Sequence, residues 1–327
     1  MATSPPTSLS QALDFQLSSG PSTTLQLPSD IGIGNVTIGG YIACVMAKYA
    51  LHYARYHPKM QHQVDLRSAV VQFYRPVFPT KPMTMRLREV SIGKGWSTLR
   101  IESFQGDKLT TSGDLVHTNF STEGVTLQMG WRPAPEPKPI DLTKLENDSH
   151  PDWISYHCAF YADGFRRGHS YAKAFIPRTP RHEYTFVEQW IEPGWDCHPD
   201  TYARWTNEMI QLIVEIPLPV QENLFPPIEG KPSTGSTAAT LEFAKLQQKA
   251  REEGREDWRA LEDDGSKRLK ARMANVSLTL STEIKQRIIL KGRMDMQVLL
   301  FDEKMDLIAI SHQTAVLIPP ASKIQKL

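Results

Sequence analysis

The chain has 327 residues, a length that is long for one domain and natural for two. Its 37 basic and 36 acidic residues leave a net charge of +1, so it lacks the positive field that would attract nucleic acid or an anionic membrane surface. The longest apolar runs, such as MIQLIVEIPLPV, are too short to span a bilayer. We therefore expect a two-domain protein that binds neither nucleic acid nor a membrane.

The two ends of the chain and its cysteines give information on where in the cell the protein is found. The start, MATSPPTSLSQ, lacks the charged and apolar regions of a secretory signal, and three widely spaced cysteines without a CxxC pair are typical of reduced thiols. We therefore expect a cytoplasmic protein with no disulfide framework and no metal site. The last residues, SKIQKL, match the peroxisomal tripeptide S-K-L only in part, and they leave a peroxisomal location open.

The first half of the chain is predicted to have an α+β fold. Residues 1–28 are rich in Ser, Thr and Pro, and we expect them to form a flexible segment. The stretch NVTIGGYIACVMAKYALHYARYH then predicts a short strand, a Gly-Gly turn and a helix whose apolar residues recur at helical spacing. Alternating strands follow in VDLRSAVVQFYRPV, MTMRLREVSIG and KGWSTLRIESFQGDKLTTSGDLVHTNF. One helix followed by several antiparallel strands indicates an α+β domain over residues 29–140.

The Pro-rich connector WRPAPEPKPIDL separates this domain from the second half, residues 141–327. The stretch PDTYARWTNEMIQLIVEI predicts a long helix that is capped by Asp200 and ended by Pro217. Residues 225–274 are charged and helix-prone, so we expect a solvated helical insertion, with a lid over a pocket as the alternative. Strands return in NVSLTLSTEIK, GRMDMQVLLF and LFDEKMDLIAISHQTAVL.

The second half repeats part of the first. The sequence KGWSTLRIESF aligns with KGRMDMQVLLF without a gap, which indicates a tandem duplication. In the first copy Gly95 lies 20 residues beyond Arg75, which ends its strand. In the second copy Gly292 lies only seven residues beyond Lys285, so this repeat is 13 residues, or one strand and a turn, shorter. A missing strand would leave a bare sheet edge, which is one reason to expect a homo-oligomer.

These segments resemble a known family. TIGGYIACVMAKYA, VVQFYRPV and KGWSTLRIESFQGDKLTTSG are similar to the first half of the thioesterase-like, double hot-dog proteins, which are relatives of acyl-CoA thioesterase II. VSLTLSTEIK and KGRMDMQVLLFDEKMDLIAISHQTAVL resemble the second half of the fungal members. The resemblance covers residues 30–320. It implies a double hot-dog fold, in which two tandem antiparallel sheets each wrap around a helix and acyl thioesters bind between the two units.

The resemblance also implies three catalytic positions. The family's Asp at the end of the second helix falls on Glu215, its Thr on the following strand falls on Ser277, and its Gln on the last strand falls on Gln313. Two of the three are therefore substitutions that keep the chemical group. The longer Glu arm moves the carboxylate by about a bond length, and catalysis can be sensitive to such a displacement. Asp163 and Asp196 are alternative carboxylates in loop-like segments.

Each of these candidates also has a purely structural alternative. On a strand, Gln313 shares one face with small residues, which leaves room for a ligand or water; a glutamine bonded to a loop carbonyl is the alternative. Glu215 lies near the end of an apolar helix, where burial and the helix dipole should raise its pKa toward the range of a general base. A solvated helix end is the alternative there. Thr279 would replace Ser277 if the strand register shifted.

Gly39 and Gly40 precede the first helix, where free N–H groups and a positive dipole suit a thioester oxyanion or a CoA phosphate. A tight strand-to-helix turn is the structural alternative at this position. The expected substrate contacts are Gly39, Gly40, Tyr41, Thr279 and His312.

Three functions fit these observations. The first is an enzyme that hydrolyses an acyl thioester on CoA or an acyl carrier, with Glu215 as general base on a water held by Ser277 and Gln313. The second is a protein of fungal secondary metabolism that releases or cyclises a polyketide-like product on the same fold. The third is a non-catalytic acyl-binding module. None of them needs a cofactor, and the sequence contains no Walker, GxGxxG or HExxH motif.

Overall fold

The chain of the computed structural model divides into two units. Unit 1 comprises Met1–Glu136, Phe160–Lys173 and Glu192–Ile216, and unit 2 comprises Pro137–Ala159, Ala174–Ile191 and Pro217–Leu327. The sequence predicted one boundary near residue 140, but two later segments belong to unit 1. The structure describes residues 9–122, 124–125, 130, 132–133, 136, 139–158, 167–179, 186–193, 205–216, 220–224, 227, 230–233, 235–261 and 293–316.

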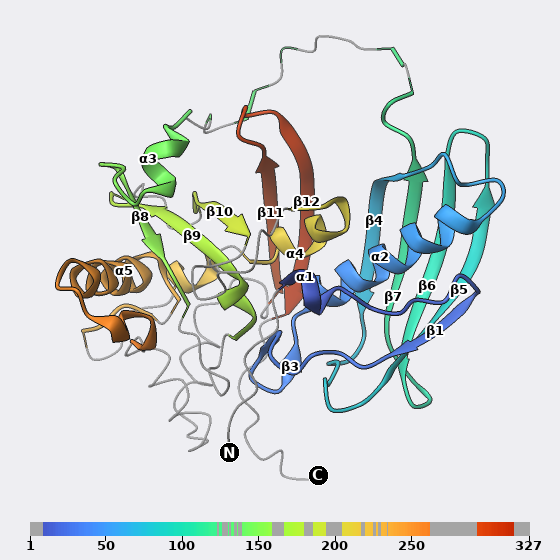
Figure 1. Ribbon diagram of the computed structural model, residues 1–327, viewed down its shortest axis with the longest axis horizontal. Helices are drawn as coiled ribbons and strands as arrows, with labels where there is room; N and C mark the ends of the chain where they lie inside the picture. The colour runs from blue at the N-terminus through green and yellow to red at the C-terminus, as the bar shows by residue number, and fades with distance from the viewer. Residues whose placement is uncertain are drawn as a thin grey trace. The chain divides into compact units, whose positions relative to one another are not determined.

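Unit 1 contains one long helix and a five-stranded antiparallel sheet (Figure 1). The helix, α2, spans Gly39–Tyr56. The strands lie in the order β1-β5-β6-β7-β4, with the bounds Ser22–Leu25, Met83–Ile92, Ser97–Gln105, Lys108–Thr118 and Asp65–Phe73. The helix and the strands that the sequence predicted for the first half are therefore confirmed. An antiparallel sheet with one long helix is also the arrangement that a hot-dog unit requires.

The sheet and α2 share one apolar core. On β6 every second residue from Ser97 to Gln105 is buried, as expected for a strand with one face on a core. The helix buries large side chains such as Ile42 and Met46. Gly113 on β7 gives Met46 its space, because a Cβ at that position would lie 3.0 Å from the Met46 Cε atom. Each fully buried side chain of this size stabilises the fold by about 1.5–3 kcal/mol.

The N-terminal segment forms regular structure from residue 9, where the composition predicted a flexible region. It contains the short helix α1 (Leu9–Ala12) and strand β1, and it buries Leu9 and Leu13. Three side chains of α2 donate hydrogen bonds to backbone carbonyl oxygens of this N-terminal segment: Tyr41 to Ala12, Lys48 to Leu13 and Tyr49 to Gly20. The prediction was wrong for this part because a Ser- and Thr-rich composition does not reveal a few well-placed leucines.

Unit 1 also contains the segment PDTYARWTNEMIQLIVEI, which the sequence predicted to be a long helix. The regular structure there is the 3-10 turn η2 (Asn207–Met209) and the short helix α4 (Ile210–Ile213). Thr206 is extended, with φ −121° and ψ 165°, so no helix passes through it. The predicted cap, Asp200, lies outside the described residues. Helix α4 packs on α2 and thereby brings the following residues to the start of that helix.

The smaller elements of unit 1 support the loop before α2. Strands β2 (Gly32–Ile33) and β3 (Val36–Thr37) form a short hairpin, and the 3-10 helix η1 spans Arg167–Tyr171. Arg167 in η1 donates to the carbonyl oxygens of Ser29 at 2.8 Å and Gly34 at 2.9 Å. Arg167 therefore ties η1 to the loop before α2.

Unit 2 contains most of a three-stranded sheet, one long helix and a hairpin. The sheet has the order β10-β9-β8, with the bounds Trp190–Pro193, Ala172–Pro177 and Trp153–Tyr156. The helices are α3 (Leu142–Glu146), η3 (Val220–Leu224), α5 (Thr237–Glu252) and η4 (Glu256–Ala260). The hairpin pairs β11 (Arg293–Phe301) with β12 (Leu307–Val316), and it confirms both strands predicted there.

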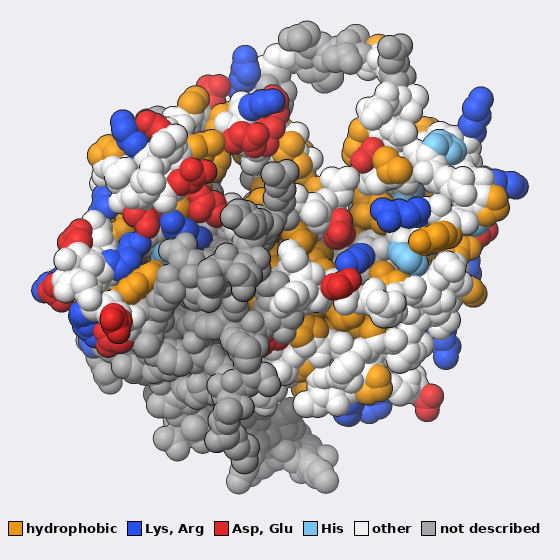
Figure 2. Space-filling view, viewed as in Figure 1, with side chains coloured by type: hydrophobic (Ala, Val, Ile, Leu, Met, Phe, Trp, Pro, Cys, Tyr) orange, Lys and Arg blue, Asp and Glu red, His pale blue; other side chains and the backbone are white. Residues whose placement is uncertain are grey.

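Helix α5 falls within the predicted charged insertion, residues 225–274, but one face of it is core. Its buried residues Thr240, Phe243, Ala244, Gln247 and Ala250 recur at helical spacing. Phe243 packs on the sheet, with its ring 6.1 Å from that of Tyr156 on β8. The Gln247 side chain bonds both the N–H and the carbonyl of His157, at 3.1 Å and 2.9 Å. Only the outward surface around α5 is a mixture of acidic and basic side chains (Figure 2).

The proposed shortening of the second repeat is not tested. The missing strand and the strand that carries Ser277 both fall within residues 262–292, which lie outside the described residues. The tandem duplication therefore stays a prediction.

We predict that His117 on β7 makes the fold sensitive to acid. Burial lowers the pKa of this histidine to about 4, against a smaller opposing effect of the Gln63 backbone. Between its unfolded pKa of about 6.5 and pH 4, the unfolded chain binds a proton that the folded chain excludes. The free energy of unfolding should therefore fall by up to about 3 kcal/mol as the pH is lowered through this window.

Urea unfolding at several pH values measures this effect. His117→Gln should remove that part of the pH dependence, whereas His312→Gln, at an exposed histidine, should not. Equal pH slopes for the wild type and His117→Gln would contradict the prediction.

A second prediction concerns α5. Phe243→Ala should lower the free energy of unfolding by about 3–5 kcal/mol, because it leaves a cavity in the core between α5 and β8. Leu246→Ala on the same helix is the matched control, since Leu246 is 59% exposed and should change stability by about 0.5 kcal/mol or less. If both variants are equally stable, α5 is a solvated insertion after all.

Candidate active site

The first turn of α2 meets the carboxylate of Glu215. The helix begins at Gly39, and its N-cap residue Ile38 gives no side-chain hydrogen bond to the free N–H groups. Glu215 lies just beyond α4, and its Oε2 atom accepts a hydrogen bond from the N–H of Gly40. Two groups that the sequence placed in separate halves of the chain therefore converge within unit 1.

Close packing explains why Gly40 is a glycine. A Cβ atom there would lie 2.5 Å from the Gln211 carbonyl oxygen and 3.0 Å from the Leu212 Cα atom, which are both backbone atoms. It would also lie 2.6 Å from Oε2 of Glu215. The missing side chain thus lets the backbone of α4 and a carboxylate approach the helix start.

Glu215 is partly buried, and burial raises its pKa to about 7. The cause is that an ionised carboxylate loses its hydration there. The hydrogen bond from the Gly39–Gly40 turn acts in the opposite direction, but its effect is smaller. A carboxylate that titrates near neutral pH is suited to accept a proton from water.

The same contact gives one N–H group of the Gly-Gly turn a partner within the protein. The sequence predicted that its N–H groups would be free for a thioester oxyanion or a CoA phosphate. The N–H of Gly40 instead points to Oε2 of Glu215. In this structure the N–H therefore holds a carboxylate in place.

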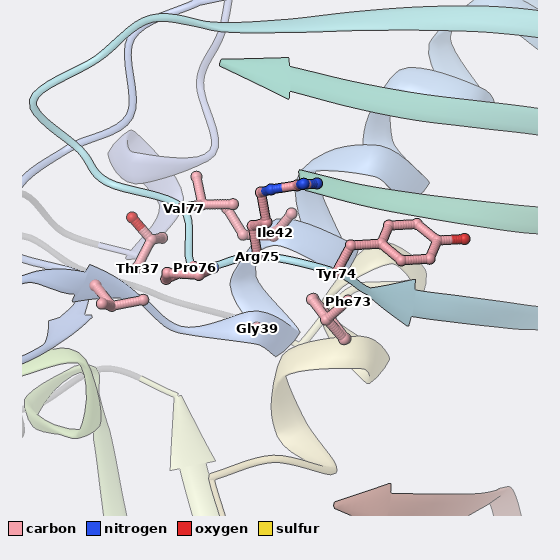
Figure 3. A pocket seen from close by; sticks show the side chains of 9 residues that line it. Thr37, Gly39, Ile42, Phe73, Tyr74, Arg75, Pro76 and Val77 are labelled. Carbon is pink, nitrogen blue, oxygen red and sulfur yellow. The ribbon is translucent and has the colours of Figure 1, made fainter. Parts of the chain in front are cut away.

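A pocket of about 330 Å³ lies beside Gly39 (Figure 3). Most of its lining is apolar, and it includes Val36, Ile42, Phe73, Pro76 and Val77. Phe73, the last residue of β4, packs on Gly39, where a Cβ atom would lie 3.2 Å from the Phe73 ring and 3.4 Å from Oε2 of Glu215. The pocket wall and the carboxylate therefore flank the same glycine.

Tyr41 and the predicted residues of β12 lie in different surroundings. Tyr41 is completely buried and donates to the Ala12 carbonyl, which makes it an anchor for α1. Gln313 is partly buried, and its Nε2 atom donates to Oγ of Ser311 at 3.3 Å. His312 is exposed on the opposite face of the strand, with its Nε2 atom 3.4 Å from the side-chain nitrogen of Gln297.

The other predicted positions are not tested. Ser277, Thr279, Asp163 and Asp196 lie outside the described residues. Glu215 belongs to unit 1 and Gln313 to unit 2, so their convergence on one cavity stays a prediction.

Sequence reasoning missed two residues beside this carboxylate and its pocket, Phe73 and Arg75. The stretch QFYRPV showed where a strand ends, because Arg-Pro closes it. It gave no sign that the ring of Phe73 would pack on Gly39, since that contact joins distant parts of the chain.

A family model and the geometry agree on the fold of unit 1. Residues 27–119 match the model of the acyl-CoA thioesterase N-terminal domain. The match spans α2 and strands β4 to β7, the elements that form the hot-dog arrangement. No curated protein matches the chain.

Several solved structures are similar to the chain. A protein assigned as a thioesterase II from Thermobifida fusca YX is 15% identical and covers 64% of this chain and 73% of its own, with a TM-score of 0.48. The tesB protein of Mycobacterium avium subs. paratuberculosis is 14% identical and covers 53% and 61%, with a TM-score of 0.32. A thioesterase complexed with coenzyme A and Zn from Thermus thermophilus is 12% identical and covers 33% and 85%, with a TM-score of 0.28. At these TM-scores the assignment of the fold rests on the family match and on the sheet and helix of unit 1.

Two further findings concern only the part of the chain that the structure describes. No cluster of three or more His, Cys, Asp or Glu side chains there could hold a metal ion. None of the helices there has both the length and the apolar character needed to cross a membrane. The expectations of no metal site and no membrane stay predictions.

We predict that Gly40→Ala separates α4 from α2. Overpacking against the Gln211 carbonyl should lower the free energy of unfolding by about 1–3 kcal/mol. The higher helix propensity of alanine offsets up to about 1 kcal/mol of this loss. Gly95→Ala is the matched control, because nothing lies within 4 Å of its would-be Cβ atom. Thermal or urea unfolding measures both variants. A Gly40→Ala protein as stable as Gly95→Ala would show that the close approach is not needed.

Proposed function

We propose that the chain hydrolyses an acyl thioester, carried by CoA or an acyl carrier, with Glu215 as the general base. One observation carries the proposal: a partly buried carboxylate with a pKa near 7 sits at the start of α2, beside a pocket. The match of residues 27–119 to an acyl-CoA thioesterase domain supports the choice of substrate class. Gly40 is the positioning residue, since its N–H fixes one oxygen of the carboxylate.

The two oxygens of Glu215 then have separate roles. Oε2 is held by Gly40, and Oε1 has no hydrogen-bond partner among the described residues, which leaves it for a water. The ionised carboxylate takes a proton from this water while the water oxygen attacks the thioester carbonyl carbon. Collapse of the tetrahedral intermediate breaks the C–S bond, and the leaving thiolate receives the proton. The products are a carboxylic acid and a free thiol.

The water also needs partners on its other side. In this proposal Ser277, or Thr279 in its place, and Gln313 hold it from the second half of the chain. A hydroxyl and an amide suit this task, because each can accept one water hydrogen or donate to the water oxygen.

A second candidate is a protein that releases or cyclises a biosynthetic product without net hydrolysis. The observation that favours it is that Glu215 and Ser277 replace the Asp and Thr of the resembling family. A displaced carboxylate would take a proton from a substrate group instead of from water. Conversion of a cyclisable thioester without thiol release from simple acyl-CoAs would favour this candidate.

We predict that Glu215→Gln lowers thiol release from acyl-CoA substrates by about 100-fold or more, because the amide cannot accept the proton. In the wild type, kcat/KM should rise with pH through about 7 and then level off, since the ionised carboxylate is the active form. A thiol-trapping dye measures both effects across a panel of acyl-CoAs.

Two variants control this experiment. Glu242→Gln removes an exposed carboxylate of α5 and should leave the rate unchanged. Glu215→Asp keeps the base and should retain part of the activity, with the pH dependence still present. Full activity of Glu215→Gln would rule out this base, and tight acyl binding without turnover in the wild type would indicate a binding module.

A further inference from the structure

The pocket beside Gly39 has a cationic residue that the proposed hydrolysis does not use. Arg75 lines the pocket just beyond the end of β4, and its side chain is drawn among the lining residues in Figure 3. The residue is exposed, so its guanidinium group can be reached from solvent. The rest of the lining is mainly apolar, which makes this charge the strongest polar feature of the pocket.

Hydrogen bonds to the start of β7 fix the position of Arg75. Its Nη1 atom donates to the Leu109 carbonyl at 3.0 Å, and its backbone N–H donates to the Thr110 carbonyl at 3.2 Å. A guanidinium group has five N–H donors, so one such bond leaves the others available. The side chain is thus held in place without being saturated.

Arg75 also has no carboxylate partner among the described residues. Three other arginines do have one, since Arg100 pairs with Asp114, Arg251 with Asp148 and Arg255 with Asp257. Arg67, Arg86 and Arg88 resemble Arg75 in having none among the described residues, but they do not line this pocket. A fixed guanidinium without a counter-ion, at the wall of a pocket, is suited to bind a carboxylate or a phosphate through two parallel hydrogen bonds.

The lining of the pocket indicates which kind of group it suits. Its volume of about 330 Å³ leaves room for an organic group of several atoms. Its mainly apolar walls favour a hydrocarbon or aromatic group. The pocket therefore suits an acyl group with an anionic group nearby.

We propose that Arg75 binds an oxyanion of the acyl thioester substrate while the apolar walls receive its acyl group. The inference rests on the proposed function for the identity of the ligand. Two sources supply the same chemistry: a carboxylate at the far end of the acyl group, or a phosphate of the CoA or carrier arm. Arg75 then determines substrate specificity and takes no part in the chemical step.

Four thioether probes, which cannot be hydrolysed, test this in the full-length protein. They are S-butyl-CoA, S-(3-carboxypropyl)-CoA and the two corresponding S-alkyl pantetheines, which lack phosphates. Calorimetry gives dissociation constants for the wild type and Arg75→Gln, a variant that removes the charge but keeps a donor for Leu109. Arg88→Gln is the matched control, because it removes an exposed arginine from β5 of the same sheet.

Arg75→Gln should weaken binding by about threefold to tenfold, as expected for the loss of one partly exposed charge contact. If the acyl carboxylate is the ligand, only the two carboxypropyl probes lose affinity. If a phosphate is the ligand, only the two CoA probes lose it. In either case Arg75→Lys should restore part of the affinity, and the wild-type affinity should fall with added salt.

Other results would overturn the inference. These are equal losses for Arg75→Gln and Arg88→Gln, no loss with any probe, or no binding of any probe to the wild type. Thermal unfolding of each variant excludes a folding defect as the cause of a loss. Thiol release that does not depend on Arg75 would leave the proposed hydrolysis intact, whereas Arg75-dependent binding without thiol release would contradict the hydrolysis alone.

Discussion

The hydrogen bond between the Glu215 carboxylate and the N–H of Gly40 joins the start of α2 to the residues that follow α4. It satisfies a free N–H at the helix start, where the N-cap residue offers no side chain of its own. It requires glycine, because the α4 backbone and the carboxylate occupy the space of a side chain. It also brings a titratable group to the edge of a pocket. One contact thus joins helix capping, helix packing and the candidate chemistry.

The electrostatics of this contact explain how a capping residue can also be a base. Helix starts favour negative charge, and a hydrogen bond from the backbone stabilises the ionised form. Burial opposes both effects and is larger, so the pKa of Glu215 rises to about 7. The charged and neutral forms are therefore both populated near neutral pH. A fully exposed glutamate would stay ionised and would be a weaker base for a water molecule.

Two of the corrections to the fold, those at the N-terminal segment and at α5, have one physical cause. Average composition suggested a flexible start of the chain and a solvated insertion, but burial depends on the spacing of a few residues. Leu9 and Leu13 give the first segment an apolar contact, and α2 supplies donors for its carbonyl oxygens. Phe243 and Ala244 lie on the buried face of α5, while Glu242, Lys245 and Lys249 are exposed. An average over the segment conceals such a stripe, whereas helical spacing reveals it.

The local elements of the first half could be predicted from the sequence alone, because their apolar spacing and turn residues act over a few positions. The sequence also pointed to Glu215 and to the Gly-Gly turn as separate candidates. The folded chain was needed to show that these two meet, that Phe73 packs on Gly39, and that Arg75 lines the neighbouring pocket. Contacts of this kind join residues far apart in the chain, and their geometry depends on how α4 and β4 pack around the start of α2. No local pattern in the sequence encodes that packing.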